Sequence, residues 1–86
     1  MVGYSLFFNE SVRKDFESIP KSDLQRIMER IGNLAENPRP PGAEKLSGQE
    51  KYRLRQGNYR IIYSIEENRL IVMVVKVGYR REVNRS

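Results

Sequence analysis

The stretch KYRLRQGNYRIIYSI, residues 51–65, decides the fold, because it has the pattern of two strands joined by a tight turn. Both halves are rich in residues that favour strands, and the intervening QGN suits a hairpin turn. Side chains alternate between the two faces of a strand. Tyr52 and Leu54 of the first strand, with Tyr59 and Ile61 of the second, therefore point inward on one face. The basic residues share the other face, which also carries Ile62.

Pairing the two strands predicts an unusual concentration of charge. A register that sets Leu54 opposite Tyr59 keeps the apolar residues of both strands on one face. The same register sets Arg53 directly opposite Arg60 on the other face. Like charges opposed across a strand pair are destabilising. The basic face therefore needs an explanation.

Two explanations of the basic face are open. In the first, the arginines extend into water or form ion pairs with Glu66 or Glu82. In the second, the face is left open to bind phosphate. Arginine suits that task because its planar guanidinium donates two hydrogen bonds to one phosphate group.

The rest of the chain predicts an α+β fold. We expect residues 4–8 to form a short strand and a helix to follow Asn9 and to end at the Ile19-Pro20 step. A second helix, expected from Ser22, has apolar residues at helical period. After a proline-rich loop and the hairpin, residues 70–76 supply a further strand. The order β-α-α-β-β-β predicts one domain, residues 1–86, with a helical hairpin packed on one face of an antiparallel sheet.

The composition excludes several classes of site. The chain has no cysteine, which excludes disulfides and cysteine nucleophiles, and no histidine, the commonest general base and metal ligand. No apolar run is long enough to cross a bilayer, and the first residues do not resemble a signal peptide. We therefore expect a cytoplasmic protein that uses no metal or other cofactor.

Positive charge is concentrated in the second half of the chain. Residues 1–50 contain 7 basic and 8 acidic side chains, whereas residues 51–86 contain 9 basic and 3 acidic ones. This asymmetry favours a nucleic acid or another polyanion as the partner, although a solvated surface would have the same composition.

Two runs, YRLRQGNYRIIYSI and LIVMVVKVGYRREV, resemble the RelE/ParE toxin superfamily, and the RelE branch more than the ParE branch. The helical hairpin and the proline-rich loop also fit, so the resemblance covers essentially the whole chain. It implies the toxin of a type II toxin–antitoxin system. RelE-like toxins are small ribonucleases that cut messenger RNA in the ribosomal A site, and a cognate antitoxin holds them inactive.

The resemblance also assigns site residues and shows two departures from the family pattern. The basic active-site positions fall on Lys51, Arg53, Arg60 and Arg80. Arg53 stands where the family usually has lysine, so a titratable amine is lost. Asn84 stands where the family commonly has a catalytic tyrosine, and asparagine neither ionises nor offers an aromatic ring for stacking.

The implied chemistry is attack on the phosphate by the RNA 2′-hydroxyl. Positioned cations can offset the developing charge without a metal, and we assign Arg60 and Arg80 to this role. Lys51 is the best candidate general base, and Tyr79 is a possible substitute for the missing phenol. Four further cations are candidates for RNA-backbone contacts: Lys45, Arg55, Arg81 and Arg85.

Two other functions fit the same residues. A ParE-like protein would inhibit DNA gyrase without enzymatic chemistry, and Asn84 leaves room for that possibility. A nucleic-acid-binding module would use the arginines only as a phosphate track.

Overall fold

The predicted hairpin forms the middle of the structure. The computed structural model describes residues 3–48 and 50–79. In it β3, Lys51–Gln56, and β4, Tyr59–Glu66, pair antiparallel across a two-residue turn. The other elements are β1 (Ser5–Phe8), α1 (Glu10–Glu17), α2 (Lys21–Asn33), β2 (Glu44–Lys45) and β5 (Ile71–Tyr79). The α+β order is confirmed, with β2 as an additional short strand in the proline-rich loop.

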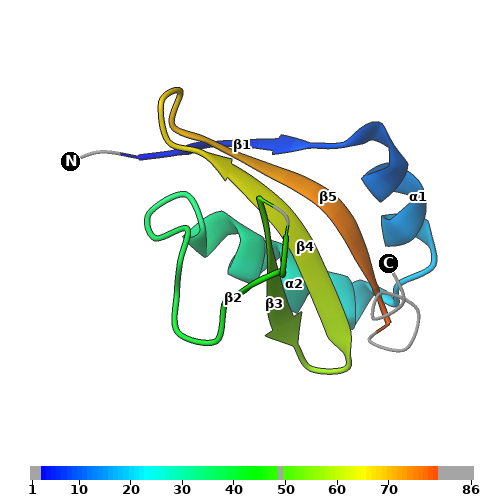
Figure 1. Cartoon of the computed structure of the whole chain (residues 1–86). Helices are drawn as coiled ribbons and strands as arrows, with labels where there is room; N and C mark the ends of the chain where they lie inside the picture. The colour runs from blue at the N-terminus through cyan, green and yellow to red at the C-terminus, as the bar shows by residue number, and fades with distance from the viewer. Residues whose placement is uncertain (1–2, 49, 80–86) are drawn as a thin grey trace.

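The sheet is mixed rather than wholly antiparallel. Its five strands lie in the order β1-β5-β4-β3-β2, and the first of them runs parallel to β5 (Figure 1). Ser5 pairs with Ile71 and Phe8 with Val74, so the first strand pairs with the last described one. The remaining neighbours are antiparallel, as expected for strands joined by tight turns.

The hairpin register differs from the expected register by two residues. Arg55, not Arg53, lies opposite Arg60, and Arg53 lies opposite Ile62. Gly57 has φ +60° and is the first residue of the two-residue turn, where the tight hairpin turns that match strand twist favour glycine. A shift of two residues leaves every side chain on its expected face. The basic face is therefore retained, but the two arginines directly opposed on it are Arg55 and Arg60 instead of Arg53 and Arg60.

The helices cover one face of the sheet and bury the core. In Figure 1, α2 lies behind β3 and β4, and α1 lies beside β5. The second helix begins at Lys21, one residue before the expected start, with Pro20 as its N-cap. Ile27 and Ile31 of α2 are fully buried with Leu54 and Ile61 of the hairpin, which the 3.6-residue period requires. No helix in the described part of the chain is long and apolar enough to cross a membrane.

The proline-rich loop between α2 and β2 is held by polar contacts to the sheet. The hydroxyl of Tyr63, which is buried in β4, donates a 2.7 Å hydrogen bond to the carbonyl oxygen of Pro38. Arg39 donates from Nε to the hydroxyl of Tyr52 at 3.0 Å and pairs through Nη1 with Glu67 at 2.6 Å. These contacts position the start of the loop that leads to β2.

The C-terminal half of β5 pairs with β4 along one edge, and its other edge is held by α1. A bulge in β5 opposite the Ile62/Tyr63 step shifts the pairing by one residue. Beyond the end of β1, Asp15 of α1 accepts a 3.1 Å hydrogen bond from the backbone N–H of Val77, and it lies 3.4 Å from Lys76 Nζ. The carboxylate therefore satisfies an edge N–H that no strand reaches.

Candidate nucleic-acid interface

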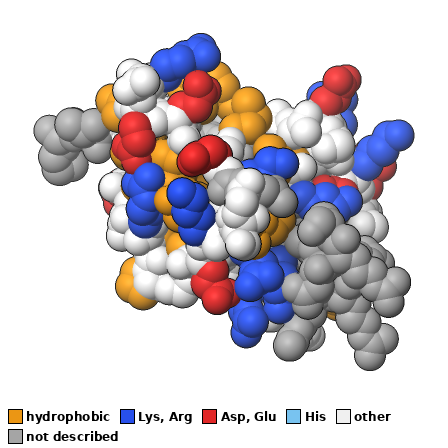
Figure 2. Space-filling view, viewed as in Figure 1, with side chains coloured by type: hydrophobic (Ala, Val, Ile, Leu, Met, Phe, Trp, Pro, Cys, Tyr) orange, Lys and Arg blue, Asp and Glu red, His pale blue; other side chains and the backbone are white. Residues whose placement is uncertain are grey.

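Four cations lie together on the sheet face opposite the helices. Lys51, Arg53 and Arg55 occupy alternate positions of β3 and so project to one side, away from the buried Leu54. Arg60 of β4 projects to the same side, opposite Arg55. We call these four residues the arginine face. Figure 2, which views this side of the sheet, shows Lys and Arg side chains gathered toward the lower end of β3 and β4.

Arg60 is the most enclosed member of the arginine face. Its residue is only 3% exposed, and it lies between Arg55 on β3 and Gly78 on β5. Arginine is rarely so buried, because desolvating its charge is costly unless the charge is compensated. Gly78 adds no side chain beside it. Strand pairing therefore places the buried Arg60 beside the exposed Arg55.

An acidic residue that the sequence did not suggest completes the cluster. Glu44 of β2 pairs in register with Arg53, and its Oε1 lies 3.0 Å from Arg53 Nη2. This hydrogen bond and the charge of Arg53 lower the pKa of the Glu44 carboxyl, with smaller contributions from the charges of Arg55 and Arg60. Glu44 is therefore a carboxylate at neutral pH and lies within the field of three arginines.

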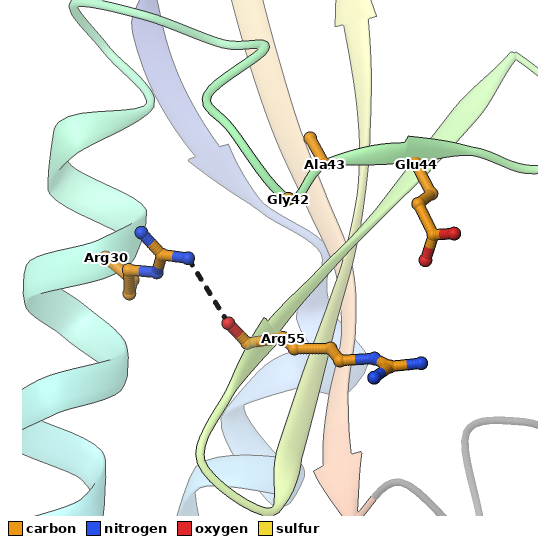
Figure 3. A pocket seen from close by; sticks show the side chains of 5 residues that line it. All are labelled: Arg30, Gly42, Ala43, Glu44 and Arg55. Atoms are coloured by element: carbon orange, nitrogen blue, oxygen red, sulfur yellow. Dashed lines mark hydrogen bonds between the residues drawn. The ribbon is translucent and has the colours of Figure 1, made fainter.

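A cavity of about 500 Å³ opens beside this cluster (Figure 3). It is lined by Arg30, Gly42, Ala43, Glu44 and Arg55. Arg30 reaches from α2 and donates a 3.4 Å hydrogen bond to the backbone carbonyl of Arg55, while the side chain of Arg55 points away from the helix. The cavity therefore separates α2 from the loop that carries Glu44.

Other candidate residues lie elsewhere. Lys45 pairs in register with Tyr52, so it faces away from Arg53, and its Nζ lies 3.9 Å from Glu50. Glu66 pairs with Arg69 at 3.8 Å instead of with the arginine face. The expectations for Arg80, Arg81, Glu82, Asn84 and Arg85 fall outside the described residues.

Tyr79 is on the helix side of the sheet, opposite to the arginine face. It lies opposite Tyr59, and their rings stack with centroids 4.8 Å apart. Tyr59 in turn donates a 3.1 Å hydrogen bond to Asp23 of α2. Burial, with contributions from Tyr79 and Asp23, raises the pKa of Tyr59. The placement of Tyr79 does not favour it as a replacement for the missing catalytic phenol.

The arginine face can bind and stabilise negative charge. Its guanidinium groups present planar donor pairs suited to phosphate oxygens. Lys51 is exposed at one end of the cluster, opposite Ser64, and is its only lysine. Among the described residues, no group of three or more acidic, histidine or cysteine side chains is arranged to hold a metal ion.

Comparison with known proteins agrees with this architecture. Residues 6–84 match the model of the family described as the ParE toxin of the type II toxin–antitoxin system parDE. The chain belongs to the RelE/ParE toxin superfamily. A RelE-like toxin protein of Escherichia coli is 31% identical to it over 80 residues, covering 90% of this chain and 83% of that protein. The toxin is therefore similar in length as well as in sequence to this relative.

Two further comparisons are to RelE proteins. The mRNA interferase toxin RelE of Escherichia coli K12 is 28% identical over 82 residues, covering 92% of this chain and 85% of that protein. The crystal structure of the archaeal RelE–RelB complex from Pyrococcus horikoshii matches with a TM-score of 0.80 and 30% identity, covering 90% of this chain and 94% of that one. The toxin therefore shares the RelE-like fold across nearly all of its length.

Proposed function

We propose that the toxin is a ribosome-dependent endonuclease that cuts messenger RNA in the A site by attack of the RNA 2′-hydroxyl. The observation that supports this most directly is the arginine face, which gathers four cations on the side of the sheet that the helices leave open. A relative from Escherichia coli is named an mRNA interferase toxin, which supports messenger RNA as the target. The site of action would be the cytoplasm.

In this proposal the residues divide the chemistry between them. Arg60, together with Arg80, stabilises the negative charge that develops on the scissile phosphate, and Arg53 supports them. Lys51 takes the proton of the 2′-hydroxyl, because it is the only amine of the cluster. The 2′-oxygen then bonds to phosphorus, the bond from phosphorus to the 5′-oxygen breaks, and the departing 5′-oxygen takes a proton from water. Arg55 contacts the RNA backbone, with Arg81 and Arg85 as further candidates. The geometry gives Lys45 less support in this role, since it faces away from Arg53.

The direct test is cleavage on purified translating ribosomes, with the cut sites mapped by primer extension. Lys51→Ala and Arg55→Met change exposed side chains of the arginine face, so folding should be retained. Arg26→Met is the matched control, since it removes an exposed arginine from α2. We expect the loss of one cation of the face to slow cutting by up to about 10²–10³-fold, and the control to cut at the unchanged rate.

Arg60 requires a different substitution, because it is buried. Arg60→Met removes the charge and retains most of the side-chain volume, so a melting curve can separate lost stability from lost activity. If a folded Arg60→Met protein and Lys51→Ala both cut at the full rate, the nuclease assignment to this face is wrong.

A cognate antitoxin is the proposed partner. The archaeal relative was solved as a RelE–RelB complex. An antitoxin should place acidic or bulky groups near the arginine face and stabilise the folded toxin by mass action. Co-expression with the product of the adjacent gene tests this: an antitoxin should co-purify and raise the melting temperature. A product that neither binds nor stabilises the toxin would contradict the proposal.

A ParE-like activity is the second candidate, and the family model itself favours it, since its description is that of a ParE toxin. In that case the basic surface would contact gyrase without cutting RNA. A DNA supercoiling assay separates the two. Inhibition of gyrase with no A-site cuts would favour the second candidate, and the reverse would favour the first.

A further inference from the structure

The inference starts from the short strand β2, which places one carboxylate on the arginine face. Glu44 and Lys45 pair with Arg53 and Tyr52, and alternation sends the side chain of Glu44 to the side of Arg53. The contact between Glu44 Oε1 and Arg53 Nη2 is 3.0 Å long, the distance of a charge-assisted hydrogen bond. Arg53 is thus already bound to an anion in the free protein.

The carboxylate is held by charge and not by burial. The side chain of Glu44 is 57% exposed, whereas that of Arg53 is 25% exposed. The charges of Arg55 and Arg60 also act on Glu44. The effect is mutual: Glu44 reduces the repulsion between arginines that strand pairing forces together. An exposed carboxylate in such a field lies where another anion would also be attracted.

The space around Glu44 allows its side chain to move away from Arg53. The cavity of about 500 Å³ adjoins both Glu44 and Arg55 (Figure 3). The loop around β2 contains Gly42, with φ +95°, and Gly48, with φ +70°. Because the side chain of Glu44 is 57% exposed, its carboxylate can rotate away from the guanidinium of Arg53 into water or into this space.

We propose that Glu44 is an internal counter-ion, which occupies on Arg53 the place of one RNA phosphate until RNA binds. The inference rests on the proposed RNA-binding function of the arginine face. When RNA binds, Arg53 exchanges the carboxylate for a phosphate oxygen. Because Glu44 already neutralises Arg53, the protein offers the RNA phosphates one fewer unpaired cation. Glu44 therefore lowers the affinity for RNA and its dependence on salt, and it assists release of the cut strand.

The salt dependence of RNA binding measures this exchange. For single-stranded nucleic acid, the slope of log K against log salt concentration is about −0.7 for each phosphate that a protein neutralises. Fluorescence anisotropy with a labelled single-stranded oligouridylate, titrated at several KCl concentrations, gives that slope. We expect Glu44→Gln to bind more tightly at low salt and to steepen the slope by about 0.7. Glu44→Asp, which keeps the charge, should restore the slope toward that of the unchanged protein.

Glu66→Gln is the matched control for the change in net charge. Glu66 is 53% exposed and also faces an arginine, Arg69 at 3.8 Å, but it is not part of the arginine face. If Glu44 acts only through net charge, the two glutamine variants will change binding equally. A steeper slope in Glu44→Gln alone supports the exchange. Melting curves of all variants verify that each protein is folded.

The outcomes separate this inference from the proposed function. Equal slopes and affinities for Glu44→Gln and Glu66→Gln would overturn the counter-ion and leave RNA binding intact. Weaker RNA binding by Glu44→Gln would also overturn it, because the carboxylate would then orient Arg53 for RNA. Binding by Glu44→Gln where the unchanged protein does not bind would support it. If no variant binds RNA, both the counter-ion and the RNA-binding face are wrong.

Discussion

Replacing Tyr63 with phenylalanine should destabilise the toxin, because the change removes the hydroxyl that holds the proline-rich loop. Tyr63 is fully buried, and its hydroxyl donates a 2.7 Å hydrogen bond to the carbonyl oxygen of Pro38, which is itself a buried residue. The substitution leaves that carbonyl without its partner, at a cost of about 1–3 kcal/mol. For a domain of this size, about 2 kcal/mol lowers Tm by roughly 8–16 °C.

Urea unfolding followed by circular dichroism measures this loss. Tyr52→Phe is the matched control, because it removes a hydroxyl that accepts a 3.0 Å hydrogen bond from Arg39 where both partners remain accessible to water. We expect the control to change the free energy of unfolding by under about 0.5 kcal/mol. If Tyr63→Phe is no more damaging than Tyr52→Phe, the hydroxyl does not hold the loop, and the reasoning fails.

The stability that the Tyr63 hydroxyl contributes should depend on pH. Burial raises the pKa of Tyr63 from 10.0 to about 12. The folded state therefore holds this proton more tightly than the unfolded state. The stability linked to it is complete below pH 10 and is lost as the pH rises toward 12. Since phenylalanine has no such proton, the stability difference between the two proteins should narrow over this interval.

Three further predictions concern other parts of the molecule. The hydrogen bond from Tyr4 and then the pair with Arg39 lower the pKa of Glu67. Glu67→Gln should therefore be less stable than the unchanged toxin at pH 7, with a difference that disappears as the pH falls below about 4.5 in urea titrations. Gly57→Ala should destabilise the folded protein by roughly 1–2 kcal/mol, because φ is +60° at this position. Gly32 lies in a helix, so Gly32→Ala should stabilise the protein by about 0.5–1 kcal/mol. Thermal melting of the two variants checks that Tm falls in the first and rises in the second. Asn84→Tyr should raise A-site cleavage by about 10²–10⁴-fold through acid–base help, and a variant that stays inert on translating ribosomes would count against a RelE-type nuclease.

The sequence predicted the features of the fold that depend on local pattern. Alternation in residues 51–65 assigned the faces of the hairpin correctly, and helical period placed Ile27 and Ile31 in the core. The register was wrong by two residues, because such a shift preserves the face of every side chain and the apolar pattern cannot detect it. The partner of β1 could not be predicted, since that pairing joins distant segments and leaves no local signal.

The candidate site was predicted in part for the same reason. Lys51, Arg53 and Arg55 lie on one strand, so alternation alone brings them together. Glu44 was missed because it lies in a two-residue strand within a loop rich in proline and glycine, where no period is visible. Lys45 was included from its charge alone, but the pairing of β2 turns it away from Arg53. Adjacent residues of a strand face opposite sides, so only one of them can join the cluster.

The pairing of β1 with β5 also sets the order in which the chain can fold. The β3–β4 and β4–β5 hairpins join neighbouring segments and close short loops. Ser5 of β1, in contrast, can pair only after Ile71 of β5 has been synthesised. Long-range contacts of this kind form slowly, because loop closure must precede them. During synthesis β1 therefore stays unpaired until β5 has left the ribosomal exit tunnel. We expect protease to digest nascent chains readily while β5 is still inside the tunnel, and chains held on the ribosome by an added C-terminal linker that places Tyr79 outside the tunnel to resist. A toxin proposed to act on ribosomes would thus remain incompletely folded on the ribosome that makes it.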